Sequence, residues 1–141
     1  MKTNYFKPVI LALFTILTIS CSKSSNSSST VNEGSSTTTN TWVKLTATTV
    51  AGVSKPNYLI LMFDQPVSST TSLPPILKQV TTDVDGLAFF DLNTMITSST
   101  PTTYYFEAFV QSGTNYIWKS VTHFNTDLSK GTMATSSIIV N

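Results

Sequence analysis

Apolar and polar residues alternate one by one through most of the chain after residue 41. In the first such run, Val43, Leu45 and Ala47 share one face of an extended backbone, opposite Trp42 and Lys44. Alternation with period two is typical of a strand with one buried and one solvated face. The same pattern, interrupted by turn residues, predicts seven strands over residues 42–48, 58–63, 76–82, 87–92, 104–111, 116–124 and 132–140.

Seven short strands in about 100 residues predict an all-β domain over residues 41–141, a single Ig-like Greek-key β-sandwich. Residues 58–63 are apolar on both faces, as expected of a central strand that is covered on each side. The run from Asp83 to Gly86 is predicted to close a hairpin between the strands at 76–82 and 87–92, because Gly86 can adopt a positive φ at little cost.

The N-terminus has the organisation of an export signal. Lys2 and Lys7 make the first seven residues basic, and an apolar run follows from Val9 to Ile19. That run is about 11 residues long, whereas a membrane-spanning helix needs roughly 20. A cleaved signal peptide is therefore favoured over a permanent transmembrane helix.

The motif Leu17-Thr-Ile-Ser-Cys21 resembles a bacterial lipobox, with Thr18 where that family usually has Leu. The resemblance implies a lipoprotein signal peptide over residues 1–20 and acyl chains on Cys21. Several chains on one residue anchor a protein firmly, since each buried methylene contributes about 0.8 kcal/mol. Ser22 is not acidic, which under the family's sorting rules favours the outer membrane of a Gram-negative bacterium, facing the periplasm or the surface. The alternative for Cys21 is a buried apolar cysteine.

Residues 21–40 separate this tether from the domain. Beyond Cys21 they are almost all Ser, Thr and Asn, which offers too little apolar surface to offset the entropy of ordering. The segment is predicted to be a disordered linker. A random coil of about 19 residues averages roughly 24 Å from end to end, enough to hold a domain clear of lipid headgroups.

Charge and cysteine content exclude several classes of protein. The chain has no arginine and a net charge of +1, so it lacks the basic surface of a nucleic-acid binder. Cys21 is the only cysteine, so no disulfide is expected. The sequence has no nucleophile elbow, P-loop or His-Glu-x-x-His motif. We therefore expect a protein that is not an enzyme and needs no cofactor.

Two segments resemble the transthyretin-like (prealbumin-like) domains of carboxypeptidase-regulatory type. They are the turn and aromatic strand of residues 82–92 and the Tyr104-Tyr-Phe-Glu-Ala-Phe109 run. The resemblance implies a transthyretin-like β-sandwich, a fold that hosts many functions and occurs in envelope lipoproteins of unassigned role. Transthyretin-like hydrolases use histidines and an arginine. This chain has one histidine, so their activity does not carry over.

The candidate ion ligands each have a simpler interpretation. Asp83 and Asp85 could bind a cation such as Ca²⁺ together with another loop, but short Asp side chains also cap their own turns. His123 is the single histidine, which cannot form the usual zinc site, so it is expected to be structural or exposed at the surface. No metal site is predicted.

Trp42 and Trp118 are the candidate ligand-stacking residues. Flat rings on a solvated sheet face can stack on sugar rings, and the alternative is that they fill the sandwich core. We therefore expect a lipid-anchored envelope protein whose non-catalytic domain serves binding or architecture, with the membrane as one partner and no nucleic acid. The alternatives are a carbohydrate-binding or adhesion module with a glycan partner, and a scaffold lipoprotein of a secretion or assembly machine with a protein partner.

Overall fold

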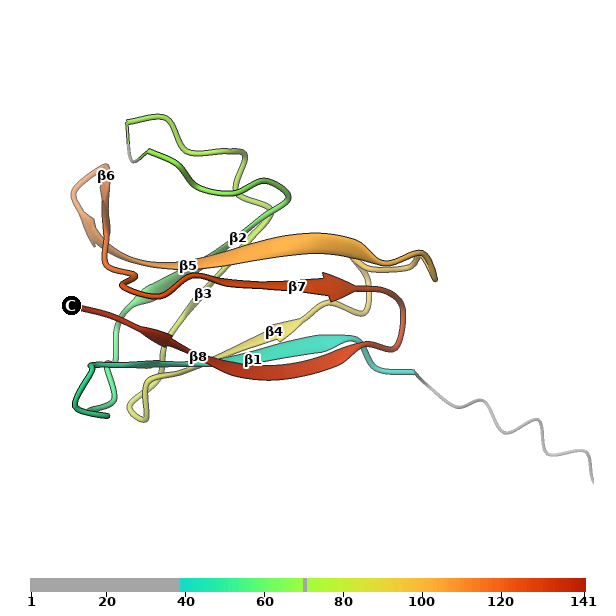
Figure 1. Cartoon of the computed structure of the whole chain (residues 1–141), viewed down its shortest axis with the longest axis horizontal. Coiled ribbons are helices and arrows are strands. Elements are labelled where there is room, and N and C mark those ends of the chain that lie inside the picture. The colour runs from blue at the N-terminus through green and yellow to red at the C-terminus, as the bar shows by residue number, and fades with distance from the viewer. Residues whose placement is uncertain (1–38, 70) are drawn as a thin grey trace, which may run out of the picture. The chain divides into compact units, whose positions relative to one another are not determined.

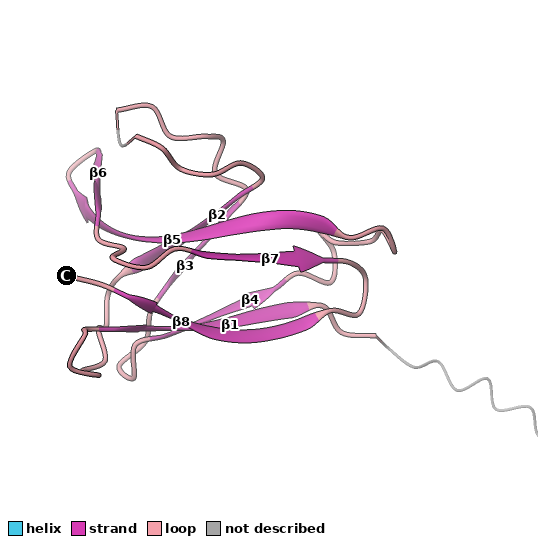
Figure 2. Cartoon of the chain, in the orientation of Figure 1, coloured by secondary structure: helices cyan, strands magenta, loops and turns pink. Residues whose placement is uncertain are grey.

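The computed structural model describes residues 39–69 and 71–141, and it contains strands and loops but no helix in that part of the chain (Figure 2). The eight strands are β1 (Trp42–Thr48), β2 (Leu59–Phe63), β3 (Lys78–Thr81), β4 (Leu87–Asp91), β5 (Thr102–Ser112), β6 (Asn115–Trp118), β7 (Phe124–Leu128) and β8 (Met133–Ile139). They form two sheets that pack as a sandwich. The predicted all-β sandwich is confirmed, with eight strands instead of seven.

The two layers are unequal (Figure 1). The smaller sheet has the order β4-β1-β8, and the larger has the order β3-β2-β5-β6, with β7 also paired to β5. Strand β8 runs parallel to β1, and the other neighbouring strands are antiparallel. A parallel pair cannot be joined by a tight turn and needs a long connection. Here the connection between β1 and β8 contains all the other strands, β2 to β7.

The main core lies between the sheets and follows the predicted alternation. Val43, Leu45 and Ala47 of β1 are fully buried against the larger sheet. Phe90 of β4 meets Phe106 of β5 edge to face, with the ring centroids 5.2 Å apart. The burial of apolar surface is the main force that holds the two sheets together. Aromatic pairs of this kind stabilise the packing further.

A second apolar cluster covers the outer face of the larger sheet. Leu61 and Phe63 of β2 and Phe109 of β5 are fully buried there. Val67, from the connection between β2 and β3, and Trp118 of β6 pack against them. Strand β2 is therefore covered on both sides, which confirms the interpretation of its doubly apolar pattern.

The predicted hairpin around Gly86 is wrong. The turn forms, because the Gly86 N–H donates to the Asp83 carbonyl at 3.0 Å and Gly86 has a φ of 75°. The strands on either side then diverge: β3 pairs with β2, and β4 pairs with β1. The turn therefore carries the chain from one sheet to the other.

The predicted strand at 116–124 is too long: β6 ends at Trp118, and β7 begins only at Phe124, the last residue of that range. The chain leaves the edge of β5 after Trp118, because Ser120 Oγ accepts the Ala108 N–H at 2.7 Å in place of a backbone carbonyl. It returns as β7, which lies mostly between the strands predicted at 116–124 and 132–140. The polar composition of β7 obscured this strand, since alternation between apolar and polar residues is weak there.

The predicted signal peptide over residues 1–20, the lipidation of Cys21 and nearly all of the linker at 21–40 lie outside the described residues. Within the described ranges, no helix is both long and apolar enough to cross a membrane. The chain enters the domain at Thr39, whose side chain lies beside Gly131 in the turn between β7 and β8.

Candidate functional site: the aromatic face of the three-stranded sheet

The outer face of the β4-β1-β8 sheet is made by alternate residues of three strands. The residues between them point inward, and in β1 all of these inward residues are buried. We call this surface the aromatic face. Its members are Leu87, Phe89 and Asp91 of β4, Trp42, Lys44, Thr46 and Thr48 of β1, and Met133, Thr135, Ser137 and Ile139 of β8.

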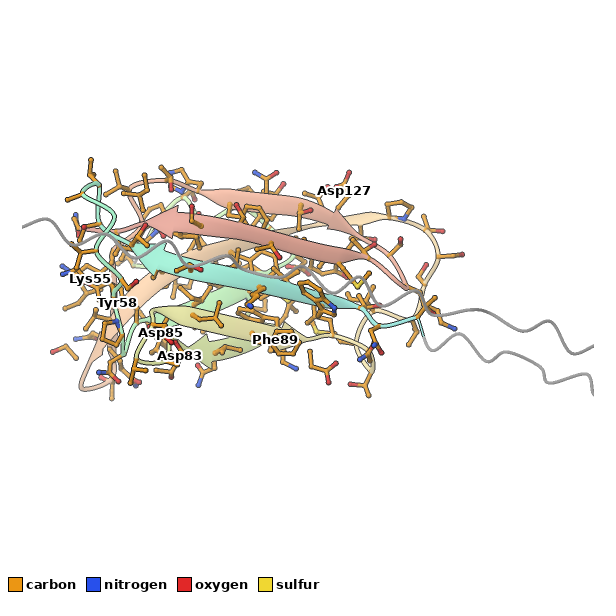
Figure 3. All side chains as sticks on the ribbon, turned by 90° about the horizontal axis from the view of Figure 1, so that it is seen from below. Lys55, Tyr58, Asp83, Asp85, Phe89 and Asp127 are labelled. Atoms are coloured by element: carbon orange, nitrogen blue, oxygen red, sulfur yellow. The ribbon has the colours of Figure 1, made fainter. Side chains whose placement is uncertain are left out.

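Two aromatic rings lie side by side on this face. The centroids of Trp42 and Phe89 are 5.9 Å apart and their planes are tilted by 38°. Strand register explains the contact: Phe89 pairs with Lys44, so it lies diagonally next to Trp42. Phe89 is 51% exposed, and Met133, paired with Trp42 on the other side, is 62% exposed. Figure 3 looks onto this sheet and labels Phe89 on β4.

Polar groups surround the rings. Lys44 lies between Phe89 and Thr135 in the register, and Thr46 lies between Leu87 and Ser137. The face thus combines apolar rings with an amine and several hydroxyl groups. These are the groups that hydrogen-bond a polar ligand while the rings hold its apolar side.

The charges of the face balance. Lys44 is its one cation and Asp91 its one anion. The Asp91 carboxylate accepts hydrogen bonds from the backbone N–H and side-chain amide of Asn93, at 3.1 and 2.8 Å. The Asp91 carbonyl accepts from Nζ of Lys78 at 2.6 Å, at the rim of the sheet.

Trp118 lies elsewhere. It belongs to the outer face of the larger sheet, where it stacks on Phe109 with ring centroids 6.4 Å apart and planes inclined by 17°. The two candidate tryptophans therefore do not form one site, and Trp42 has Phe89 as its aromatic neighbour instead.

Glu107 is a buried carboxylate beside Trp118. Its Oε2 accepts the Trp118 Nε1–H at 3.0 Å, and its Oε1 lies 2.7 Å from Nδ1 of His123. The Glu107 side chain is 4% exposed and the His123 side chain 59% exposed. Glu107 can orient the histidine ring. The Ser120 hydroxyl, three residues before His123 in the sequence, accepts the Ala108 N–H. The arrangement links β5 to the segment between β6 and β7.

The carboxylate of Asp83 accepts hydrogen bonds within its own turn. Oδ1 of Asp83 accepts the N–H groups of Asp85 and Leu87, at 3.0 and 2.9 Å, so this carboxylate caps its own turn. Figure 3 shows both Asp side chains at one end of the domain, near Lys55 and Tyr58. In the described ranges, no group of three or more His, Cys, Asp or Glu side chains is placed to hold a metal ion.

Sequence reasoning missed Phe89 and Met133 as parts of the site, and Glu107 as a buried group. Alternation placed Phe89 on the face of its strand away from Ala88 and Phe90. It gave no sign that this strand lies beside β1, because that pairing is set by the tertiary fold. The signal that could have found Phe89 is a large aromatic residue on the polar side of a strand.

The sequence matches no protein-family model and no curated protein. Among solved structures, a chain described as the structure of the streptococcal ancillary pilin matches 74% of this chain, with 14% sequence identity and a TM-score of 0.45. The match covers 33% of the pilin chain, so this chain spans about a third of its length. A likeness this distant does not bear on function.

Proposed function

We propose that this is a lipoprotein of the outer membrane of a Gram-negative bacterium, anchored through Cys21. Its transthyretin-like β-sandwich binds a ligand at the envelope and performs no chemistry. The observation that carries the binding role is the open aromatic face, where Phe89 is 51% exposed beside Trp42 and Met133 is 62% exposed. Large apolar side chains that are grouped on a solvated surface are typical of binding sites.

The anchor rests on the sequence of the N-terminus. An apolar run that is too short to span a membrane, followed by a lipobox-like motif and Cys21, is the pattern of a lipoprotein precursor. The polar linker would then leave the domain free to turn toward a ligand. Because the tether limits the domain to one surface, even weak binding gains from the high local concentration.

Two more specific roles each have a supporting observation. The contact between Trp42 and Phe89 favours a carbohydrate-binding or adhesion module. A scaffold lipoprotein of a secretion or assembly machine is favoured by exposed valines in loops, since Val50 is 81%, Val84 85% and Val121 51% exposed. Such apolar loop tips could dock a protein partner.

The experiment on the anchor compares the full chain with Cys21→Ala in a Gram-negative host. We expect the wild-type protein in the outer-membrane fraction, with an intact mass that lacks residues 1–20 and includes acyl chains. Cys21→Ala should remain uncleaved or become soluble. Identical cleavage and solubility of the two proteins would disprove the lipid anchor.

A further inference from the structure

We infer that the aromatic face binds a neutral, β-linked pyranose glycan, with Trp42 and Phe89 as its stacking platform and the amine and hydroxyl groups around them as hydrogen-bond partners. This inference rests on the proposed binding function and deepens it, because it names the surface and the class of ligand.

The two aromatic rings form a surface on which a sugar can stack. Trp42 and Phe89 are adjacent, with centroids 5.9 Å apart, and they occupy an open sheet face, not a closed core. The face of an aromatic ring is electron-rich, so it attracts the polarised C–H groups on the flat side of a pyranose. A β-1,4-linked chain is an extended ribbon that presents such flat sides in succession, which suits two neighbouring rings.

Polar groups beside the rings can hydrogen-bond the sugar hydroxyls. Lys44, Thr46, Thr135 and Ser137 occupy the rows next to the rings. In the described part of the chain, no hydrogen bond involves the amine of Lys44 or the three hydroxyls. These groups can donate to sugar hydroxyls, and the three hydroxyls can also accept from them.

The size of the face argues against a protein partner. Three strands spaced by about 4.8 Å, with seven residues in β1 at about 3.3 Å each, span about 14 by 23 Å, or about 330 Å². A stable protein interface needs about 800 Å² from each partner. A few sugar units need far less, so the face fits a glycan better than a second copy of this chain or another folded protein.

The charges argue against an anionic ligand. The face has one lysine and one aspartate, and Lys78 at its rim already donates to the Asp91 carbonyl. A surface for a sulfated or uronic polysaccharide needs several cations to replace the counterions that the polymer releases. Balanced charge leaves stacking and hydrogen bonding as the source of affinity, which selects a neutral ligand.

The test measures retention of the full chain, expressed in a Gram-negative host and extracted in detergent, on insoluble cellulose, insoluble chitin and heparin-agarose. We expect retention on cellulose or chitin, and the stronger of the two identifies the sugar. Trp42→Ala and Phe89→Ala should each lower the association constant about tenfold, which corresponds to ~1.4 kcal/mol. Trp42→Phe should keep most of the affinity because it keeps a ring.

Ile117→Ala is the matched control, because Ile117 is 45% exposed but lies on β6 of the larger sheet, away from the aromatic face. Its retention should equal that of the wild type, and the midpoints of thermal unfolding should show that every variant is folded. The inference is overturned if neither neutral polymer retains the protein, if retention survives both alanine substitutions, or if heparin retains it more strongly.

Its failure is distinguishable from failure of the anchor. A protein that is bound to the membrane through Cys21 but retained by neither cellulose nor chitin contradicts the glycan inference alone. If retention depends on Trp42 but Cys21→Ala does not change the fraction in which the protein is found, the lipid anchor alone is contradicted.

Discussion

Nδ1 of His123 lies 2.7 Å from Oε1 of Glu107, and so an exposed histidine covers a carboxylate that is almost fully buried. The second oxygen of Glu107 accepts from the Trp118 indole at 3.0 Å. One side chain of β5 therefore holds both the end of β6 and the segment that follows it. Both oxygens have a partner, which is the condition under which a buried carboxylate is tolerated.

Glu107→Ala is expected to lower the free energy of unfolding by about 1–3 kcal/mol, because it leaves the indole N–H of Trp118 without its acceptor. Glu107→Gln should cost less than half as much, since an amide can accept from Trp118 and donate to Nδ1 of His123. Urea denaturation measures both. Equal losses would show that the charge matters and the hydrogen bonds do not.

Thr82→Val should destabilise the domain by about 1–3 kcal/mol, since it removes a buried hydroxyl with two partners. Thr82 Oγ1 donates to the Lys55 carbonyl at 2.7 Å and accepts the Tyr58 N–H at 2.9 Å. The matched control is Thr81→Val, one residue earlier and exposed, which should change the unfolding free energy by less than about 0.5 kcal/mol. Similar effects at both positions would contradict a structural role for the Thr82 hydroxyl.

Gly86→Ala is expected to cost about 2 kcal/mol or more, for two reasons. Gly86 has a φ of 75°, and a Cβ added there would lie 2.7 Å from the Ala47 carbonyl oxygen. Gly52→Ala separates these causes, because Gly52 has a φ of 78° but no atom within 4 Å of the added Cβ. It should cost only about 1–2 kcal/mol, the strain of the backbone. Thermal unfolding that ranks Gly52→Ala as the worse variant would refute the crowding at Gly86.

Asp83→Ala should lower stability by about 1 kcal/mol, as the loss of a capping side chain does, because Asp83 accepts two N–H groups in its turn. Asp85→Ala should have little effect, since no hydrogen bond involves the Asp85 carboxylate among the described residues. Calcium in millimolar excess should leave the Tm of the wild type unchanged. A calcium-dependent rise in Tm that both substitutions abolish would instead establish the cation site.

Much of the local structure could be predicted from the sequence. Alternation identified the buried and exposed faces of β1, and the doubly apolar pattern of β2 correctly indicated cover on both sides. Trp42 was placed on the outer face of its strand for the same reason. These inferences succeed because side chains of a strand point alternately to its two faces, whatever the strand pairs with. The lipid anchor at Cys21 stays a prediction from the sequence.

Only the tertiary structure decided which strands meet. Period two fixes the face of a residue but not its neighbour, so the sequence could not show that the turn at Gly86 crosses between sheets or that Phe89 lies beside Trp42. Alternation puts Glu107 on the same face of β5 as Phe109, but it does not show that this face is covered. The burial of Glu107 depends on Trp118 and on the connection between β2 and β3, which cover that face. An apolar strand can pair with its neighbour in the sequence or with a strand far away in the chain. The aromatic face forms because β4 pairs with β1 and not with β3.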